Sequence, residues 1–463
     1  MIAVAAALLS AACFYLGMGL HDAWPLAWLA PLPLLWLAYG PAKTWQVGLA
    51  ALAAGALGNG WLWEAYGSIM GPRILILAVA QGLILAIVVV LSRLPARRLS
   101  PAVGWLAFPA LWTTAELGIS YLPDGTFGSW AYSQVGQPAL IQGASVFGLW
   151  IISFLIAATA SGVAMALRTR RKAPLAIATA LFALNLGFGL LRLGTTFAGQ
   201  HVTAAAAAID DDAYEHRASR TAIDLNLKTV EAEAAEARAL AAKGARYIVF
   251  PEKAALLKPE WRAALYAPLI KAADDTGATI VAGFDQAGPD RRNIAVVFAP
   301  HAAPYAYAKR HMVPGLESMF VPGPGAGVFA PRQAVAICKD MDFQATLRAD
   351  AQNHIGVMLV PAWDFDADGW AHARMAILRG VEGGYAIVRS AKNGLVTVTD
   401  AQGRIVARAT SGKNGYAAAM SQVLPGPGTA NYLQIGDAFA WACLVLAAVL
   451  LALGFTRKPV ANP

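Results

Sequence analysis

Apolar residues dominate both ends of the chain, and a mixture of polar and apolar residues separates them. Residues 1–198 and 433–456 are almost wholly apolar, whereas residues 199–432 resemble an ordinary soluble domain in their polarity. A helix that crosses a bilayer core needs about 20 mostly apolar residues. Eight stretches meet this need, at residues 2–20, 23–40, 45–66, 73–92, 101–118, 139–167, 174–196 and 433–456. The pattern therefore predicts a membrane α-helical bundle of eight spans with one large insert.

The same pattern divides the chain into three segments. Residues 1–198 are expected to form a membrane domain of seven transmembrane helices, and residues 199–432 a separate globular domain. Residues 433–463 hold the eighth helix and a tail. The composition also indicates a membrane protein, because only 14% of the 463 residues are charged, whereas soluble domains carry about 25%.

Basic residues give the orientation of the spans. The net charge is +8, but many basic residues lie in short loops or ends beside apolar spans: Lys43, Arg93, Arg97, Arg98, Arg168, Arg170, Arg171, Lys172, Arg457 and Lys458. The loops after spans two, four and six hold all of these except Arg457 and Lys458, which follow span eight, whereas the alternate loops hold only Arg73. Since such charges stay in the cytoplasm, the insert is expected outside. Without them no basic patch remains for a nucleic-acid partner.

The insert alternates between strand-like and helix-like segments. Strands are predicted at 202–209, 246–250, 279–284, 293–299, 334–338, 356–362, 386–390, 395–399 and 404–408. Helices are predicted at 214–242, 259–274, 343–353 and 370–383. This alternation, ending in strands alone, favours a layered α/β domain. No glycine-rich phosphate loop follows a strand, so nucleotide binding is unsupported.

Three residues at strand-like ends carry the candidate chemistry. Glu252 closes "YIVFPE", Lys309 lies in "YAYAKRHMVPGLE", and Cys338 closes "AVAIC". Groups at the carboxyl ends of strands converge on one crevice. A carboxylate that takes a thiol proton, a thiolate that attacks a carbonyl and an ammonium that stabilises the oxyanion form an acyl-transfer set. Each residue alone also fits a plainer role: an inert buried thiol, a surface carboxylate after proline, or a solvated basic pair.

The motifs "FPE", "YAKRH" and "ICKD", in this order, resemble the nitrilase or carbon–nitrogen hydrolase superfamily, whose triad is Glu, Lys and Cys. Residues 127–157, 373–395 and "YLQIGDAFAW" extend the resemblance to the apolipoprotein N-acyltransferase family. The resemblance implies eight spans in the bacterial inner (cytoplasmic) membrane. It also implies a periplasmic nitrilase-like domain, an α-β-β-α sandwich, between the seventh and eighth spans.

The resemblance further implies a ping-pong reaction in lipoprotein biosynthesis. Glu252 is expected to act as general base while Cys338 attacks a glycerophospholipid ester and forms a thioester. Lys309 and the backbone N–H of Lys339 would hold the oxyanion. The amine of a diacylglyceryl-cysteine lipoprotein would then resolve the thioester. The family's additional glutamate falls on Glu317. The expected partners are the phospholipid donor, the lipoprotein acceptor and the bilayer, with no cofactor and no metal.

Two departures from the family keep other functions open. The family usually has an aromatic residue and a glutamate after the cysteine, where this chain has Lys339 and Asp340. Its domain tends to open with a Gln-Gly-Asn strand end, where this chain reads "AAAAAIDDDAY". A membrane-tethered amidase with the same triad and water as acceptor is therefore the alternative. A silent relative that binds lipoproteins or lipid is a third.

Side chains outside the triad receive more modest expectations. Lys339 is expected to favour the thiolate form of Cys338 through its charge. Trp363 and Asp364 either line the wall of the substrate pocket or serve only in packing. Trp130 and Tyr132 are either interfacial aromatic residues or part of the path by which lipid reaches the thiol. Glu116 is expected to be a buried polar tie between helices.

Overall fold

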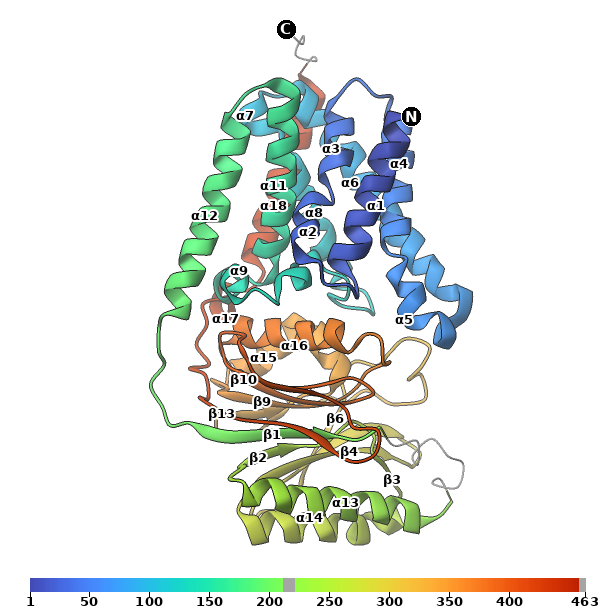
Figure 1. Cartoon of the computed structure of the whole chain (residues 1–463), viewed down its shortest axis with the longest axis vertical. Coiled ribbons are helices and arrows are strands. Elements are labelled where there is room, and N and C mark those ends of the chain that lie inside the picture. Colours follow the sequence, from blue (N-terminus) through green and yellow to red (C-terminus); the bar gives the residue numbers. More distant parts are fainter. Residues whose placement is uncertain (211–220, 458–463) are drawn as a thin grey trace. The chain divides into compact units, whose positions relative to one another are not determined.

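The computed structural model describes residues 1–210 and 221–457 (Figure 1). These residues fall into two compact units. The helical unit comprises Met1–Leu122, Thr126–Thr195 and the chain from Gln434 onward, and the sandwich unit comprises Pro123–Gly125 and Thr196–Leu433.

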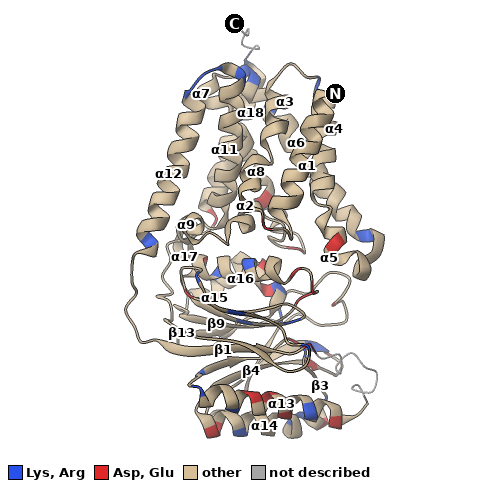
Figure 2. Ribbon diagram, in the orientation of Figure 1, with Lys and Arg blue, Asp and Glu red and all other residues tan. Residues whose placement is uncertain are grey.

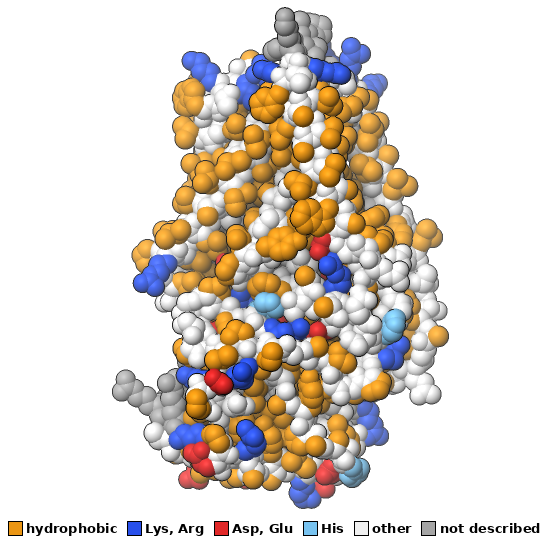
Figure 3. Space-filling model, turned by 180° about the vertical axis from the view of Figure 1, so that it is seen from behind, with side chains coloured by type: hydrophobic (Ala, Val, Ile, Leu, Met, Phe, Trp, Pro, Cys, Tyr) orange, Lys and Arg blue, Asp and Glu red, His pale blue; other side chains and the backbone are white. Residues whose placement is uncertain are grey.

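The helical unit is built from helices of unequal length. They are α1 (Ile2–Met18), α2 (Trp24–Leu29), α3 (Leu32–Tyr39), α4 (Thr44–Gly58), α5 (Trp61–Met70), α6 (Ile74–Arg98), α7 (Pro101–Gly104), α8 (Ala107–Ile119), α9 (Pro138–Ile141), α10 (Ala144–Phe147), α11 (Leu149–Thr169), α12 (Ala173–Leu193) and α18 (Ala438–Thr456). Figure 2 shows few charged residues along the middle of these helices. Hydrophobic side chains cover the face of this unit that is visible in Figure 3. These features are those of a membrane protein.

The structure supports the membrane class without confirming eight spans. Within the described residues, four stretches are long and apolar enough to cross a membrane: Trp61–Arg98, Leu149–Thr169, Ala173–Leu193 and Ala438–Thr456. Shorter apolar helices lie at Ile2–Met18, Trp24–Tyr39, Thr44–Gly58 and Pro138–Phe147. The stretch predicted at 45–66 is interrupted, because α4 ends at Gly58 and the Asn59 side chain bonds back to the Gly55 carbonyl at 2.8 Å. The count of eight stays a prediction.

The sandwich unit contains two sheets. The first has the order β13-β1-β2-β4-β5-β6, with β3 paired to β4. Its strands are β1 (Val202–Ala208), β2 (Tyr247–Val249), β3 (Ala255–Leu257), β4 (Thr279–Gln286), β5 (Arg292–Phe298), β6 (Tyr305–Ala308) and β13 (Ala417–Val423). The second has the order β12-β11-β10-β9-β8-β7. Its strands are β7 (Val328–Ala330), β8 (Gln333–Val335), β9 (Val357–Trp363), β10 (Ala386–Lys392), β11 (Leu395–Thr399) and β12 (Ile405–Thr410).

Helices cover the outer face of each sheet, which completes an α-β-β-α sandwich (Figure 1). The helices are α13 (Ile223–Ala242) and α14 (Arg262–Thr276) on the first sheet, with α15 (Gln344–Ala351) and α16 (Gly369–Gly383) on the second. Successive side chains of a strand point to opposite faces. Ala205 and Ala207 of β1 accordingly pack in the core shared with the helices, whereas Ala204 and Ala206 pack between the sheets. The layered α/β prediction is thereby confirmed.

Three strands were not predicted at all, β6 was indicated only as the strand-like run before Lys309, and some predicted boundaries are wrong. β3, β7 and β13 are absent from the predicted set. β13 is rich in alanine, a weak strand former, and it is held by its antiparallel pairing with β1 along seven residue pairs. The strand predicted to end at Cys338 ends at Val335. The helix predicted over 214–242 begins at Ile223, and residues 211–220 lie outside the described residues.

Candidate active site

Elements of the first sheet bring a carboxylate, an amide and an ammonium to one edge. β2 is parallel to β4, and β5 is antiparallel to both β4 and β6. Glu252 follows β2, Lys309 directly follows β6, and Asn293 stands near the start of the antiparallel strand β5. All three side chains are buried. The convergence expected of strand ends therefore holds for Glu252 and Lys309.

The turn that carries Glu252 packs tightly against β4. A Cβ atom at Gly283 would lie 2.4 Å from the Pro251 carbonyl oxygen and 2.7 Å from the Glu252 Cα. The Ala254 N–H donates to the Gly283 carbonyl at 2.9 Å. The Glu252 N–H donates to the Ala362 carbonyl of the second sheet at 3.2 Å. Glycine at 283 thus allows the close approach that fixes the backbone of Glu252.

Cys338 begins a tight turn and does not close a strand. It is the first residue of a 3-10 turn over Cys338–Asp342, with φ of +40°. A non-glycine residue in this region costs on the order of 1–3 kcal/mol, and such strain gathers at active sites. The Sγ atom lies 3.6 Å from the Trp363 carbonyl oxygen. Cys338 therefore projects from a constrained turn beside the end of β9.

Asp340 holds this turn to the segment that follows β6. Its buried carboxylate accepts hydrogen bonds from the N–H groups of Ile337 at 3.0 Å, Arg310 at 3.1 Å and His311 at 3.0 Å. The Tyr307 hydroxyl donates to it at 2.7 Å, and His311 Nδ1 lies 3.0 Å away. Burial alone would raise the pKa of Asp340, but the contacts with His311 and the other donors lower it. An ionised Asp340 thus fixes the turn at Cys338 to the segment Arg310–His311.

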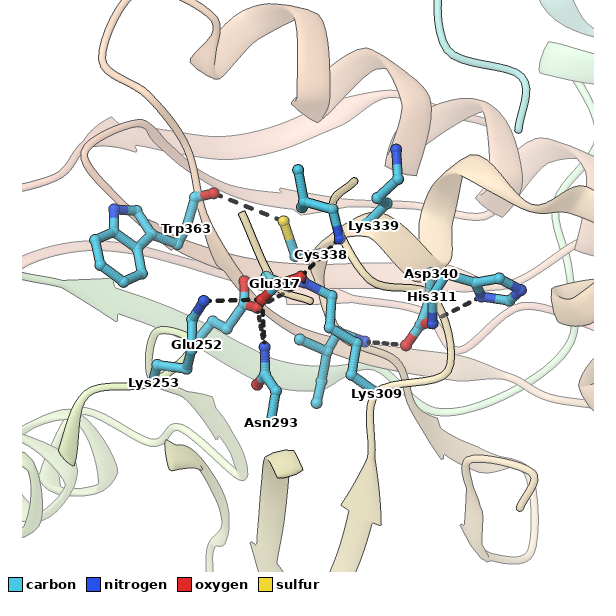
Figure 4. A network of polar contacts seen from close by, with 12 residues as sticks. Glu252, Lys253, Asn293, Lys309, His311, Glu317, Cys338, Lys339, Asp340 and Trp363 are labelled. Atoms are coloured by element: carbon cyan, nitrogen blue, oxygen red, sulfur yellow. Dashed lines mark hydrogen bonds and ion pairs between the residues drawn. The ribbon is translucent and has the colours of Figure 1, made fainter. Parts of the chain in front are cut away.

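A four-charge cluster, Glu252, Lys253, Lys309 and Glu317, lies beside the thiol (Figure 4). Lys309 Nζ donates to Glu252 Oε1 at 2.8 Å and to Glu317 Oε2 at 2.7 Å. Lys253 Nζ donates to Glu317 Oε1 at 2.8 Å. Asn293 Nδ2 bridges the carboxylates, donating to Glu317 Oε1 at 3.0 Å and also to Glu252 Oε1. Charge-assisted bonds of this kind are stronger than neutral ones.

The charges of this cluster set its protonation. Burial alone would lower the pKa of Lys309, but Glu252 and Glu317 raise it well above its ordinary value. Burial would raise the pKa of Glu317, but Lys309 and then Lys253 lower it to about 2. Burial and then the charge of Glu252 raise the pKa of the Cys338 thiol. The resting site therefore holds an ammonium, an ionised Glu317 and a protonated thiol.

The expectation that Lys339 favours the thiolate is wrong. The Lys339 ammonium lies 3.3 Å from a carboxylate oxygen of Asp342 and 3.3 Å from one of Asp124. The Lys339 ammonium is therefore paired with these two carboxylates, and the pKa of the Cys338 thiol is raised. The predicted oxyanion contact of the Lys339 backbone N–H stays a prediction.

The predicted pocket residues have different surroundings. The Trp363 ring contacts two cations, with its centroid 5.0 Å from Lys253 Nζ and 3.4 Å from Lys392 Nζ. Asp364 forms a buried ion pair with Arg389, whose Nη1 is 3.1 Å from Oδ2. That pair makes Asp364 a support for the end of β9 and leaves Trp363 as the candidate wall.

Trp130 and Tyr132 belong to the helical unit. The Trp130 ring stacks on Trp112 at 3.9 Å between centroids, and the Tyr132 hydroxyl lies 2.5 Å from Thr126 Oγ1. Their place near a substrate stays a prediction. Glu116 is buried as predicted, and its carboxylate ties α8 to the 3-10 segment Trp130–Gln134, since it accepts from the Trp130 N–H at 2.9 Å as well as from Trp112 Nε1 of its own helix at 3.1 Å.

Two site residues were missed from the sequence. Lys253 and Asn293 both contact Glu317. Lys253 directly follows Glu252 in "FPEK", which was the available signal, whereas Asn293 is brought in by strand pairing alone. Among residues 1–210 and 221–457, no three His, Cys, Asp or Glu side chains are grouped in a way that suits a metal ion.

Comparisons with known proteins agree with this architecture. Residues 204–422 match the carbon-nitrogen hydrolase family model, so the sandwich unit is a domain of the carbon–nitrogen hydrolase class. Residues 10–162 match the model of the apolipoprotein N-acyltransferase N-terminal domain. The chain belongs to the apolipoprotein N-acyltransferase family and is an acyltransferase.

Individual relatives extend over nearly the whole chain. An apolipoprotein N-acyltransferase of Geobacter metallireducens is 28% identical and covers 94% of this chain and 92% of its own. One of Chromobacterium violaceum is 27% identical and covers 94% and 91%. Among solved structures, an amidase from Nesterenkonia sp. is 21% identical, with a TM-score of 0.39, and covers 54% of this chain and 98% of its own.

Proposed function

We propose that this protein transfers an acyl chain from a glycerophospholipid, through a thioester on Cys338, to the N-terminal amine of a diacylglyceryl-cysteine lipoprotein. One observation carries the proposal. The buried Glu252–Lys309 ion pair, 2.8 Å from nitrogen to oxygen, lies beside the Cys338 thiol (Figure 4). A base and an oxyanion donor beside a thiol are the parts that acyl transfer requires.

The first half-reaction begins from the protonated thiol. Glu252 Oε1 accepts from Lys309 and Asn293, while no described residue donates a hydrogen bond to Oε2. We assign Oε2 to receive the thiol proton as Sγ attacks the ester carbonyl carbon. Two of the three N–H bonds of Lys309 are used by the carboxylates, and the third is assigned to the developing oxyanion. When the ester C–O bond breaks, Glu252 returns the proton to the lysophospholipid alcohol.

The second half-reaction reverses these roles. The lipoprotein amine attacks the thioester carbonyl carbon, and Glu252 accepts a proton from the attacking nitrogen. The C–S bond then breaks and Cys338 leaves as a thiolate, which recovers its proton from Glu252. A new amide is formed and the resting enzyme is restored.

Intact-protein mass spectrometry tests this function. After incubation of the purified full chain with phospholipid vesicles, the mass is expected to rise by one acyl chain, and neutral hydroxylamine should remove it. A diacylated lipopeptide should discharge the adduct and become triacylated. Rapid decay in buffer to free fatty acid, with no effect of lipopeptide, would instead establish the hydrolase alternative. An unmodified mass with every phospholipid would show that the donor assignment is wrong.

The proposal also includes the predicted membrane arrangement. Residues 1–198 would supply seven spans and residues 433–463 the eighth, which places residues 199–432 in the bacterial periplasm and keeps both acylated substrates in the lipid of the inner membrane. An Asp290→Cys variant provides an exposed reporter thiol on the β4–β5 loop. A membrane-impermeant maleimide is expected to label it in intact spheroplasts. Labelling only after lysis would reverse the orientation.

A further inference from the structure

We propose that Lys253 is a positioning residue that neutralises Glu317 and thereby keeps Glu252 ionised, ready to accept the thiol proton. The inference rests on the proposed function, because it assigns Glu252 as the base. It gives Lys253 a part in the reaction without contact with the reacting atoms. Lys253 reaches Glu252 through the bonds that link the two carboxylates.

Shared donors couple Glu252 to Glu317. Lys309 Nζ is within 2.8 Å of an oxygen of each carboxylate, and Asn293 Nδ2 donates to Oε1 of both. Two carboxylates held by the same nitrogen atoms lie close enough to repel each other. A negative charge on one carboxylate therefore disfavours a negative charge on the other.

The charge balance of the cluster depends on Lys253. Glu252 and Glu317 carry two negative charges, and Lys309 neutralises one. Lys253 supplies the second positive charge through its bond to Glu317 Oε1 at 2.8 Å. With only one ammonium, a buried pair of carboxylates would retain an uncompensated charge and would take up a proton instead. A proton on the pair removes the base that the thiol needs.

The position of Lys253 is built into the turn. Its backbone has φ of +50°, in the left-handed region, and its side chain is only 13% exposed. The ammonium lies 5.0 Å from the Trp363 ring centroid and 5.4 Å from that of Phe320. Both distances suit cation–π attraction. These contacts direct the lysine toward Glu317 and distinguish it from a solvated surface lysine.

Neighbouring charged groups have partners of their own. Arg291, which stacks on Phe320, donates from Nε to Asp285 at 2.8 Å. Lys392 lies over the Trp363 ring. Arg389 is paired with Asp364, and both act on the Cys338 thiol. Within the described residues, Lys309 and Lys253 are the only cations ion-paired with the two glutamates.

The rate at which iodoacetamide alkylates Cys338, measured against pH in the full-length protein, tests the inference. A Cys13→Ala/Cys443→Ala background leaves Cys338 as the only thiol. In Lys253→Met, the acid limb of the profile should move about 1–3 pH units upward. Without the Lys253 charge, the pair of carboxylates is expected to hold a proton at neutral pH, so alkylation there should be slower. In Lys253→Arg, which keeps the positive charge, the acid limb should stay at its original pH.

A double variant separates a charge effect from a structural one. In a Glu317→Gln background one carboxylate charge is gone, so adding Lys253→Met should no longer shift the limb. An unshifted limb in Lys253→Met, or a slower rate at every pH without a shift, would overturn the inference. If the limb shifts but no variant forms an adduct with phospholipid, the inference stands and the proposed acyl donor fails.

Discussion

Replacing Cys338 by alanine is expected to abolish the acyl adduct and to reduce acyl transfer to background. In the proposed mechanism the thioester forms on Sγ, so a chain without this atom has nothing to accept the acyl group. Alanine tolerates φ of +40° about as well as cysteine does, so the variant should keep the fold and insert into membranes. The measurement is the intact mass after incubation with phospholipid, together with the rate of lipopeptide acylation.

The other two cysteines provide the matched control. Cys13 and Cys443 lie in α1 and α18 of the helical unit. A Cys13→Ala/Cys443→Ala protein is expected to form the adduct at the normal rate. An adduct that persists in Cys338→Ala but is lost in this control would assign the nucleophile to one of the helices and would refute the site described above.

Replacing Lys309 by methionine is expected to lower acyl transfer by roughly 10²-fold or more, the usual scale for losing an oxyanion donor. The side chain is 1% exposed and bonds to Glu252 and Glu317. Its loss leaves two buried carboxylates with Lys253 as their one ammonium. Removing one partner of a buried ion pair costs about 3–5 kcal/mol, so thermal unfolding in detergent should occur at a lower temperature. Single-turnover thioester formation, measured well below that temperature, isolates the catalytic loss.

Lys271→Met is the matched surface control. Lys271 lies on α14 in an i,i+4 pair with Asp275, with 70% of its side chain exposed. Exposed pairs of this kind contribute about 0–1 kcal/mol, so activity and unfolding temperature should barely change. Near-normal thioester formation in Lys309→Met would show that another group stabilises the oxyanion.

Periodicity and residue type predicted much of the sandwich unit, and tertiary pairing accounts for what they missed. Strands such as β4 and β9 are short apolar runs bounded by turn residues, so the local sequence is enough to predict them. The local sequence does not predict β13, because its alanine-rich segment is held as a strand by pairing with β1. In the helical unit, hydropathy marks apolar stretches but does not reveal breaks such as Asn59, whose side chain bonds to its own helix.

The candidate triad was predictable because Glu252, Lys309 and Cys338 each follow a strand or a strand-like run. The neighbouring residues that contact this candidate triad were not predictable. Asn293 enters from an antiparallel strand, so its place depends on a pairing that the sequence does not display. The direction of the Lys339 side chain follows from the turn at Cys338, whose positive φ gives no signal in residue type.

The proposed base and the proposed nucleophile belong to different sheets. Glu252 and Lys309 follow strands of the first sheet, whereas Cys338 follows β8 of the second. Small side chains such as Ala204 and Ala206 lie between the sheets and set their separation. In the proposed mechanism, the distance over which the proton would travel therefore depends on core volume as well as on Glu252 and Cys338 themselves. Substitutions that change the volume of these small core side chains should therefore alter the rate without contacting a substrate. Positions that do not tolerate substitution should accordingly extend into the core between the two sheets.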